Sequence, residues 1–396
     1  MNSLIIIFSA IALDAIGIGL VFPILPRLLQ ALAPGGDTAL AVGLVAALYA
    51  LAQFLFAPVL GALSDRYGRR PILLLSLAGA SASYLLMACA TDFRLLLLGR
   101  AIAGLTSANL AVATAYITDI STEEERAGRF GLLNALFGAG FIVGPVLGGA
   151  LGDHALRLPF LAAALLNGLN FLLALFALPE SHAPSRAPFA LQTLNPLRSL
   201  RWTVSMKPLR TVAVLFFLFS ATGEVYGTCW ALWGKDAFNW NGLWIGLSLG
   251  AFGICQAVVQ ATLPGRAVRL MGERGTVLGG LACASLALVV LAFAQRAWMV
   301  FAVMPVFALG GIGTPALQAI ATRQVGRKEQ GQLQGVLSSV MSLAAVVGPL
   351  AFATIYGAVR LRWPGAVWLS VIAVHAAVVP IVTGLRPQAP REPEAV

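Results

Sequence analysis

The stretch GALSDRYGRRP, residues Gly61 to Pro71, gathers one acid and three arginines in a chain that has few charges elsewhere. Only 11% of the 396 residues are charged and 59% are hydrophobic, and the mean hydropathy is +0.86. A soluble protein has a charged fraction near a quarter of its residues. Long apolar runs flank the stretch on both sides, so we interpret it as a short loop between two membrane-spanning segments.

Twelve apolar runs are long enough to cross a bilayer, which takes about 20 residues as a helix. The runs are apolar throughout rather than alternating, which predicts an all-α membrane protein with 12 transmembrane helices and excludes lipid-exposed strands. The first run carries Asp14 and lacks a basic leader, so we do not expect it to be a cleaved signal. The predicted spans lie near 4–26, 41–62, 71–90, 95–117, 132–152, 158–178, 211–233, 243–264, 275–294, 297–319, 335–357 and 365–385.

The second half of the chain repeats the first at an offset of 204 residues. GLLNALFGAGFIVGP, which begins at Gly131, aligns with GVLSSVMSLAAVVGP, which begins at Gly335. We therefore expect an N-terminal six-helix domain (1–178), a cytoplasmic linker (179–210) and a C-terminal six-helix domain (211–396). Parallel six-helix repeats with a site between them are a transporter architecture, although a duplicated bundle without a transport role remains an alternative.

The net charge of +10 follows the loops rather than a nucleic-acid surface. The loops that alternate with the first one, counted from Arg66, hold far more lysines and arginines than the other set. This bias predicts that the basic loops and both termini lie in the cytoplasm. It gives no reason to expect a nucleic-acid partner. The partners that we expect are the lipid bilayer, protons and a small-molecule substrate.

Three ionisable residues lie well inside predicted spans: Asp14, Arg100 and Glu224. Each costs roughly 2.5 kcal/mol or more when left alone in lipid, so we expect them to face the protein interior. Burial disfavours an ionised carboxyl and a nearby arginine favours it, so a carboxyl between those influences can bind and release a proton. The alternatives are a helix-helix hydrogen bond for Asp14, a fixed ion pair for Arg100 and a non-titrating substrate contact for Glu224.

The four cysteines and three histidines form no cluster with metal-ligand or nucleophile spacing. The sequence also has no G-x-x-x-x-G-K-[ST] loop for a nucleotide. We therefore expect no metal site, no cofactor and no enzymatic activity. A membrane-embedded enzyme and a channel or receptor are weaker alternatives to a carrier.

At these residues the chain resembles the major facilitator superfamily, and more narrowly the tetracycline efflux proteins among the twelve-helix drug/proton antiporters. The resemblance implies a bacterial inner-membrane protein, driven by the proton motive force and probed best as a monomer, that works by alternating access. It runs nearly end to end, and its motifs are LDAIGIGLVFPILP (13–26), LYALAQFLFAPVLGALSDRYGRRPILLLSLAGA (48–80), GRAIAG (99–104), FGAGFIVGPVLGG (137–149), LNGLNF (166–171), LPESH (178–182), GGIGTPALQA (310–319) and EQGQLQG (329–335).

The resemblance assigns the opening stretch to a conformational latch. Asp65 is expected to meet the N-terminal end of the eleventh helix, where the helix dipole favours a carboxylate. The glycine-rich run around Gly144 and Pro145 resembles the antiporter motif of the fifth helix, which is expected to pack against the other half. The residues assigned to the latch and gate are Gly61, Asp65, Arg66, Gly68, Arg69, Arg70, Asp119, Gly144 and Pro145.

The resemblance also assigns proton coupling to Asp14 and Arg100, with Glu224 as a further acid. The family usually has acids in helices 3 and 9 and a histidine in helix 8, where this chain has Ser83, Ala284 and Gln256. Tetracycline, which can arrive chelated to a metal ion, is therefore a weakened assignment. Polar and aromatic side chains within spans suit flat amphipathic ligands. The predicted substrate contacts are Tyr49, Gln53, Tyr84, Asn109, Tyr226, Trp230, Gln256, Gln260 and Gln318.

Together these observations predict a proton-coupled efflux antiporter for amphipathic drug-like molecules, with tetracyclines as candidate substrates. The alternative in the same class is a proton-coupled uptake symporter for a small metabolite or vitamin. The glycine run in the fifth helix argues against uptake.

Overall fold

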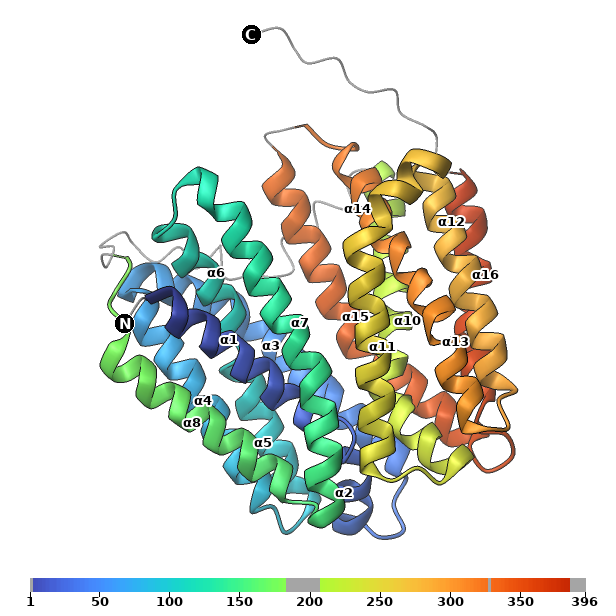
Figure 1. Ribbon diagram of the computed structural model, residues 1–396, viewed down its shortest axis with the longest axis horizontal. Helices are drawn as coiled ribbons and strands as arrows, with labels where there is room; N and C mark the ends of the chain where they lie inside the picture. The colour runs from blue at the N-terminus through green and yellow to red at the C-terminus, as the bar shows by residue number, and fades with distance from the viewer. Residues whose placement is uncertain (1–2, 183–206, 327–328, 385–396) are drawn as a thin grey trace, which may run out of the picture.

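The computed structural model describes residues 3–182, 207–326 and 329–384, and within them all regular structure is helical. Twelve helices or broken helices are long and apolar enough to span a membrane, as the sequence predicts. The helices, labelled as in Figure 1, are α1 Ser3–Val21, α2 Leu25–Leu32, α3 Thr38–Tyr67, α4 Arg69–Ala88, α5 Phe93–Leu105, α6 Asn109–Asp119, α7 Glu123–His154, α8 Leu158–Ala177, α10 Lys207–Phe238, α11 Gly242–Thr262, α12 Pro264–Ala292, α13 Ala297–Leu309, η2 Gly310–Ile312, α14 Gly313–Thr322, α15 Gln330–Val359 and α16 Ala366–Gly384.

Most of the predicted linker, 183–206, lies outside the described residues. The second half begins earlier than expected, because α10 is already helical at Lys207. The first span also differs from its prediction: α1 ends at Val21 and a separate short helix, α2, follows. This helix starts with a proline in its first turn and buries Leu25, Leu28 and Leu29, so packing rather than length accounts for it.

The internal repeat has a structural counterpart at the same offset. The pair α5 and α6 forms one span that breaks after Leu105, and α13, η2 and α14 form another that breaks after Leu309. Gly68 and Gly272 both have positive φ angles, +100° and +69°, where a side chain would be strained. The first separates α3 from α4, and the second bends α12 at the equivalent point.

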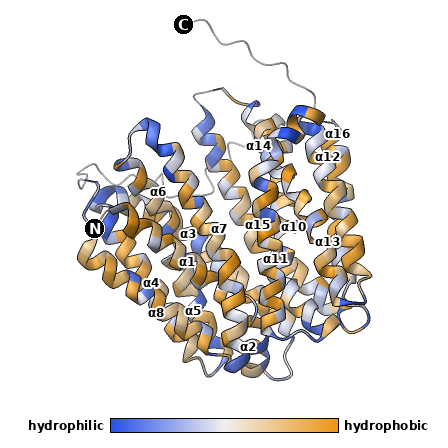
Figure 2. Ribbon diagram, in the orientation of Figure 1, coloured by the Kyte–Doolittle hydropathy of each residue, from blue (hydrophilic) through white to orange (hydrophobic). Residues whose placement is uncertain are grey.

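Polar residues begin several helices at the ends of the bundle, where water is available to the backbone. The side chain of Asp37 accepts from the backbone N–H groups of Ala39 and Leu40 at the start of α3. Asn241 accepts from Trp244 at the start of α11, which is the equivalent helix of the other half. Large apolar side chains such as Phe176 and Leu286 are exposed along the flanks, as expected for a lipid-facing surface (Figure 2).

The two six-helix halves stand side by side (Figure 1). We call the end with the first residue of α1 and the last of α16 the terminal face, and the other end the opposite face. Near the opposite face the halves touch closely through two helix pairs, α7 with α11 and α3 with α15. A β-carbon added to Gly43 of α3 would lie 2.6 Å from that of Ala353 of α15. Toward the terminal face the halves diverge, and added β-carbons at Gly131 of α7 and Gly331 of α15 would meet nothing within 4 Å.

Candidate transport site

A polar cluster surrounds Asp14 inside the N-terminal half. Asp14 lies beyond the midpoint of α1, and the Asn109 amide, at the first turn after the break between α5 and α6, is within hydrogen-bonding reach of its carboxyl. The break itself supplies Ser107, whose hydroxyl bonds to the Tyr49 hydroxyl and to Gln53 Nε2, both at 2.9 Å. Interrupted helices at matching places in two repeats are a pointer to a transport site.

Arg100 joins the cluster by stacking rather than by an ion pair. Its guanidinium carbon lies 4.5 Å from the centre of the Tyr49 ring, which is a cation–π distance. Its Nε is buried without a hydrogen-bond partner. The described ion pairs do not include one between Arg100 and Asp14, so the expected pairing of these two residues is absent in this conformation.

Tyr84 and Asn109 are buried at 5% and 6% exposure. Both belong to the walls of the cluster: the Tyr84 ring approaches Gly17 of α1, and Asn109 faces Asp14. Four predicted substrate contacts, namely Tyr49, Gln53, Tyr84 and Asn109, are thus brought together around Asp14 and Arg100.

Glu224 lies on α10 at the boundary with α15 in the C-terminal half. A β-carbon on Gly348 of α15 would be 2.9 Å from the Glu224 β-carbon, so the stem of the glutamate packs in the space that this glycine leaves. No described hydrogen bond engages its carboxylate. Glu224 and Asp14 therefore belong to different halves, as the sequence predicts, and neither is neutralised by a described ion pair.

A cavity of about 200 Å³ lies within the C-terminal half, next to the second helix break. Its walls are mainly aromatic: the Tyr226 and Phe307 ring centres are 4.7 Å apart, and those of Phe252 and Phe307 are 4.8 Å apart. Of the predicted substrate contacts it includes Tyr226 and Gln256. The lining residues are Phe219, Thr222, Gly223, Tyr226, Phe252, Gln256, Gly280, Leu281, Ala284, Phe307, Gly310, Gly311 and His375.

Three other predicted contacts lie elsewhere. Trp230 is only 3% exposed and its indole donates to Ser248 at 2.9 Å, so it is wrong as a cavity wall in this structure and belongs to the aromatic core. Gln260 donates to the Gly311 carbonyl at 3.0 Å and does not line the cavity. Gln318 is exposed on α14 and likewise lies outside the cavity.

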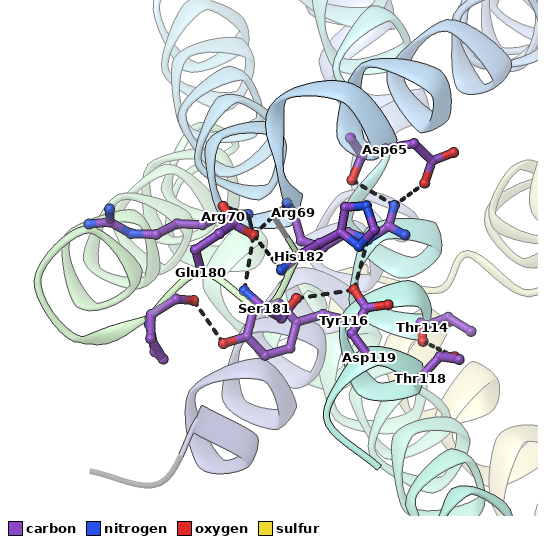
Figure 3. A network of polar contacts seen from close by, with 12 residues as sticks. Asp65, Arg69, Arg70, Thr114, Tyr116, Thr118, Asp119, Glu180, Ser181 and His182 are labelled. Atoms are coloured by element: carbon purple, nitrogen blue, oxygen red, sulfur yellow. Dashed lines mark hydrogen bonds and ion pairs between the residues drawn. The ribbon is translucent and has the colours of Figure 1, made fainter. Parts of the chain in front are cut away.

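The charged stretch of the opening forms a network at the terminal face (Figure 3). Arg69 bonds to both Asp65 and Asp119, the latter at 3.0 Å. Arg70 donates to the Leu175 carbonyl at 2.6 Å. Arg66 lies against the ring of Tyr67, 5.5 Å from its centre.

The expected contact between Asp65 and the start of α15 is not made in this structure. The Asp65 side chain is 67% exposed and its described partner is Arg69. The physical reason is the separation of the halves at the terminal face. Gly61 is also not a close-approach position, because a β-carbon there would meet nothing within 4 Å. Gly68 is one: a β-carbon there would collide with the Glu180 carboxylate.

Glu180, from the LPESH motif, is a functional residue that the latch assignment omitted. Its Oε1 accepts from the backbone N–H of Arg69 at 2.8 Å, and its Oε2 accepts from that of Arg70 at 3.2 Å. It therefore caps the N-terminus of α4, where the helix dipole favours an anion. The acid was visible in the sequence, but its partner, more than a hundred residues earlier, was not.

The glycine run of α7 packs against two helices, including one from the other half. Near Pro145, a β-carbon on Gly144 would lie 2.7 Å from the Ile16 carbonyl of α1. Gly149 and Gly242 of α11 are in backbone contact across the two halves. This agrees with the expectation that the run brings the fifth helix close to a helix of the other half.

Asp153 completes this contact at the opposite face. Its Oδ1 and Oδ2 accept from the backbone N–H groups of Gly242 and Leu243, each at 2.9 Å, and its Oδ1 also pairs with Arg27 at 2.5 Å. A second contact between the halves joins Lys235 Nζ to Gln30 at 2.6 Å. Sequence analysis assigned Asp153 no role, because a helix-end carboxylate is an ordinary feature until its partner helix is known.

Two helical repeats with interrupted spans, a membrane-embedded acid in each half and a cavity beside the second break define a secondary transporter. The chain belongs to the Major Facilitator Superfamily, whose family model matches residues 7–228 and 212–396. It is a transporter rather than an enzyme, and a multi-pass protein of the bacterial inner membrane.

Within the superfamily the chain is of the tetracycline resistance type. It is 47% identical over 379 residues to the class C tetracycline resistance protein of Escherichia coli, covering 96% of each chain. It is 42% identical over 381 residues to the class G protein of Vibrio anguillarum, covering 96% of this chain and 97% of the relative. The nucleoside transporter NupG shares the fold, with a TM-score of 0.82 at 12% identity over 96% of this chain and 99% of that chain.

Proposed function

We propose that the protein is a proton-coupled antiporter that exports planar amphipathic drug-like molecules, tetracyclines among them, across the bacterial inner membrane. The observation that carries this proposal is the arrangement around the two helix breaks. An uncompensated carboxyl, Asp14, lies in the polar cluster at the first break, and an aromatic cavity lies at the second. The similarity to tetracycline resistance proteins from two organisms supports the substrate class.

The basic loops place the terminal face in the cytoplasm by the positive-inside rule. On this orientation the structure is open toward the cytoplasm and closed toward the periplasm by α7 and α11. The Asp65 contact to the start of α15 then belongs to the opposite state, in which the cytoplasmic ends of the halves meet. The charged stretch would stabilise that state, and the Asp153 contact would stabilise the one described here.

The transport cycle follows from competition between a proton and substrate for carboxyl charge. In the state open to the cytoplasm, ionised Asp14 and Glu224 favour a cationic or hydrogen-bonding substrate. After the halves rock, protonation from the periplasm removes that charge and releases the substrate. Return to the first state lets the proton leave to the cytoplasm. The stacked guanidinium of Arg100 favours proton release from Asp14, because a nearby cation stabilises the carboxylate.

The protein needs no cofactor of its own on this account. Where a tetracycline carries a chelated metal ion, the ion arrives as part of the substrate. The contacts described within one chain are sufficient for alternating access, so we propose that the monomer is the functional unit.

Cells that express the protein should accumulate less tetracycline, followed by its fluorescence, than cells with an empty vector. Collapse of the proton gradient with an uncoupler should restore accumulation. Lower accumulation that survives the uncoupler would contradict proton coupling. Higher accumulation on expression would support the uptake alternative instead.

A further inference from the structure

His375 reaches the C-terminal cavity from α16, a helix to which sequence analysis assigned no functional residue. Its side chain is 8% exposed and lines the cavity together with Tyr226 and Gln256. Among the lining residues, His375 and Tyr226 are the two that titrate, and histidine is the one whose ordinary range falls near physiological pH.

Ser285 of α12 fixes the orientation of the imidazole. Its Oγ lies 3.0 Å from His375 Nδ1, and the described residues give the hydroxyl no other hydrogen-bond partner. The serine proton is therefore directed at Nδ1, which places the ring proton on Nε2. Nε2 has no described protein partner and is the donor that the cavity receives.

Few other charges face His375 from the helices that pack against α16. On α10 these helices offer Tyr226, in the cavity wall, and Glu224, whose stem packs against Gly348 of α15. On α12, Cys283 is the nearest titratable residue in sequence to Ser285, and the charged residues of that helix lie in its first eleven positions, up to Arg274. On α15 the titratable group is Tyr356, whose hydroxyl donates to Asp236. A proton on the imidazole thus has no adjacent anion in an ion pair to stabilise it.

The size of the cavity limits what it can hold. Binding sites for whole drug-sized ligands measure about 300–1,000 Å³. A cavity of about 200 Å³ with aromatic walls suits one planar portion of such a ligand.

We propose that this cavity is a subsite for a planar ring of the exported molecule, with His375 as its proton-sensitive hydrogen-bond donor. The inference rests on the proposed function above. Neutral His375 donates from Nε2 to an acceptor oxygen on the ring system. Protonation places a positive charge between aromatic walls beside a cationic substrate and takes away the Nδ1 acceptor of the Ser285 hydroxyl, so it favours release.

The test uses full-length protein in lipid nanodiscs titrated with magnesium-chelated tetracycline, followed by ligand fluorescence between pH 8 and pH 5.5. The wild type should bind about tenfold more weakly at the acidic end, since one linked protonation changes affinity by at most about tenfold per pH unit. His375→Gln retains a donor, so it should bind within about twofold of wild type at pH 8 and lose most of the acid weakening. His375→Phe should bind about tenfold more weakly at pH 8, as expected for loss of one buried hydrogen bond.

His154→Gln is the matched control, because His154 is exposed at the end of α7, and it should behave as wild type. Ser285→Ala keeps the imidazole but frees Nδ1, so its acid weakening should shift to higher pH. An unchanged pH profile in His375→Gln, with wild-type affinity in His375→Phe, would overturn the subsite. If those variants also export with full proton coupling, the proposed function stands without it. If the wild type neither binds nor exports tetracycline, both proposals fail.

Discussion

Asp153 at the end of α7 accepts a hydrogen bond from the backbone N–H of Gly242, the first residue of α11 in the other half, at 2.9 Å. The carboxylate thereby caps a helix of the opposite domain, and Arg27 holds it from α2 at 2.5 Å. The contact mirrors the one expected of Asp65 at the other end of the bundle. Each would use a carboxylate on one half and a helix N-terminus on the other.

The first prediction concerns this gate. Asp153→Ala should shift the protein toward the state that is open at the opposite face, because hydrogen bonds to a charged group contribute about 1.5–3 kcal/mol. Spin labels at His154 and Asn239, one in each half, should show a longer mean separation than in the wild type. Asp153→Asn keeps an acceptor and should give an intermediate distribution. Identical distributions in all three proteins would remove Asp153 from the gate.

The second prediction concerns proton coupling by the two membrane-embedded acids. Asp14→Asn or Glu224→Gln should abolish export driven by a proton gradient and leave substrate counterflow, because binding and rocking need no titration. Asp92→Asn is a suitable control, since this exposed acid caps α5 through an acceptor oxygen that asparagine retains. Full gradient-driven export by both variants would exclude Asp14 and Glu224 from coupling.

The third prediction concerns Gly68 and its acid neighbour. Gly68→Ala should lower the thermal stability of the protein in detergent, because a positive φ costs a non-glycine residue roughly 1–2 kcal/mol and the new methyl would displace Glu180. Gly61→Ala, where the methyl meets nothing within 4 Å, should be neutral or slightly stabilising. Tryptophan fluorescence melting measures both variants. Equal melting temperatures for the two would contradict the close approach.

The fourth prediction concerns the stack of Arg100 on Tyr49. Tyr49→Leu should impair transport more than Tyr49→Phe, which keeps the ring for the guanidinium but loses the hydroxyl bond to Ser107. The readout is the initial rate of tetracycline export in vesicles, with protein amount matched by immunoblot. Equal rates in the two variants would mean that the ring face contributes nothing to the site.

The amino-acid pattern was sufficient for the spans and the duplication, because lipid requires long apolar helices and a repeat preserves its register. The offset that aligned the two halves also places Gly68 on Gly272, and both take the same unusual backbone conformation. The grouping of Tyr49, Gln53, Tyr84 and Asn109 around Asp14 was likewise within reach of the sequence.

The parts that could not be predicted depend on which helices meet. Trp230 has the composition of a ligand contact, but its indole is satisfied by Ser248 in the core. His375 and Asp153 gain their meaning from partners on helices distant in sequence, Ser285 and Gly242. The Asp65 contact depends on the conformational state as well, and a sequence does not specify one state of a two-state protein.

The central claim is that proton movement and substrate movement are coupled in opposite directions through the embedded carboxyls. The most direct measurement uses purified protein in liposomes with an acidic lumen, in which tetracycline uptake and lumenal pH are followed together. The account predicts that the drug enters while the lumen becomes less acidic, and that Asp14→Asn removes both signals. Drug uptake without any change in lumenal pH, or at an equal rate without a pH gradient, would contradict it.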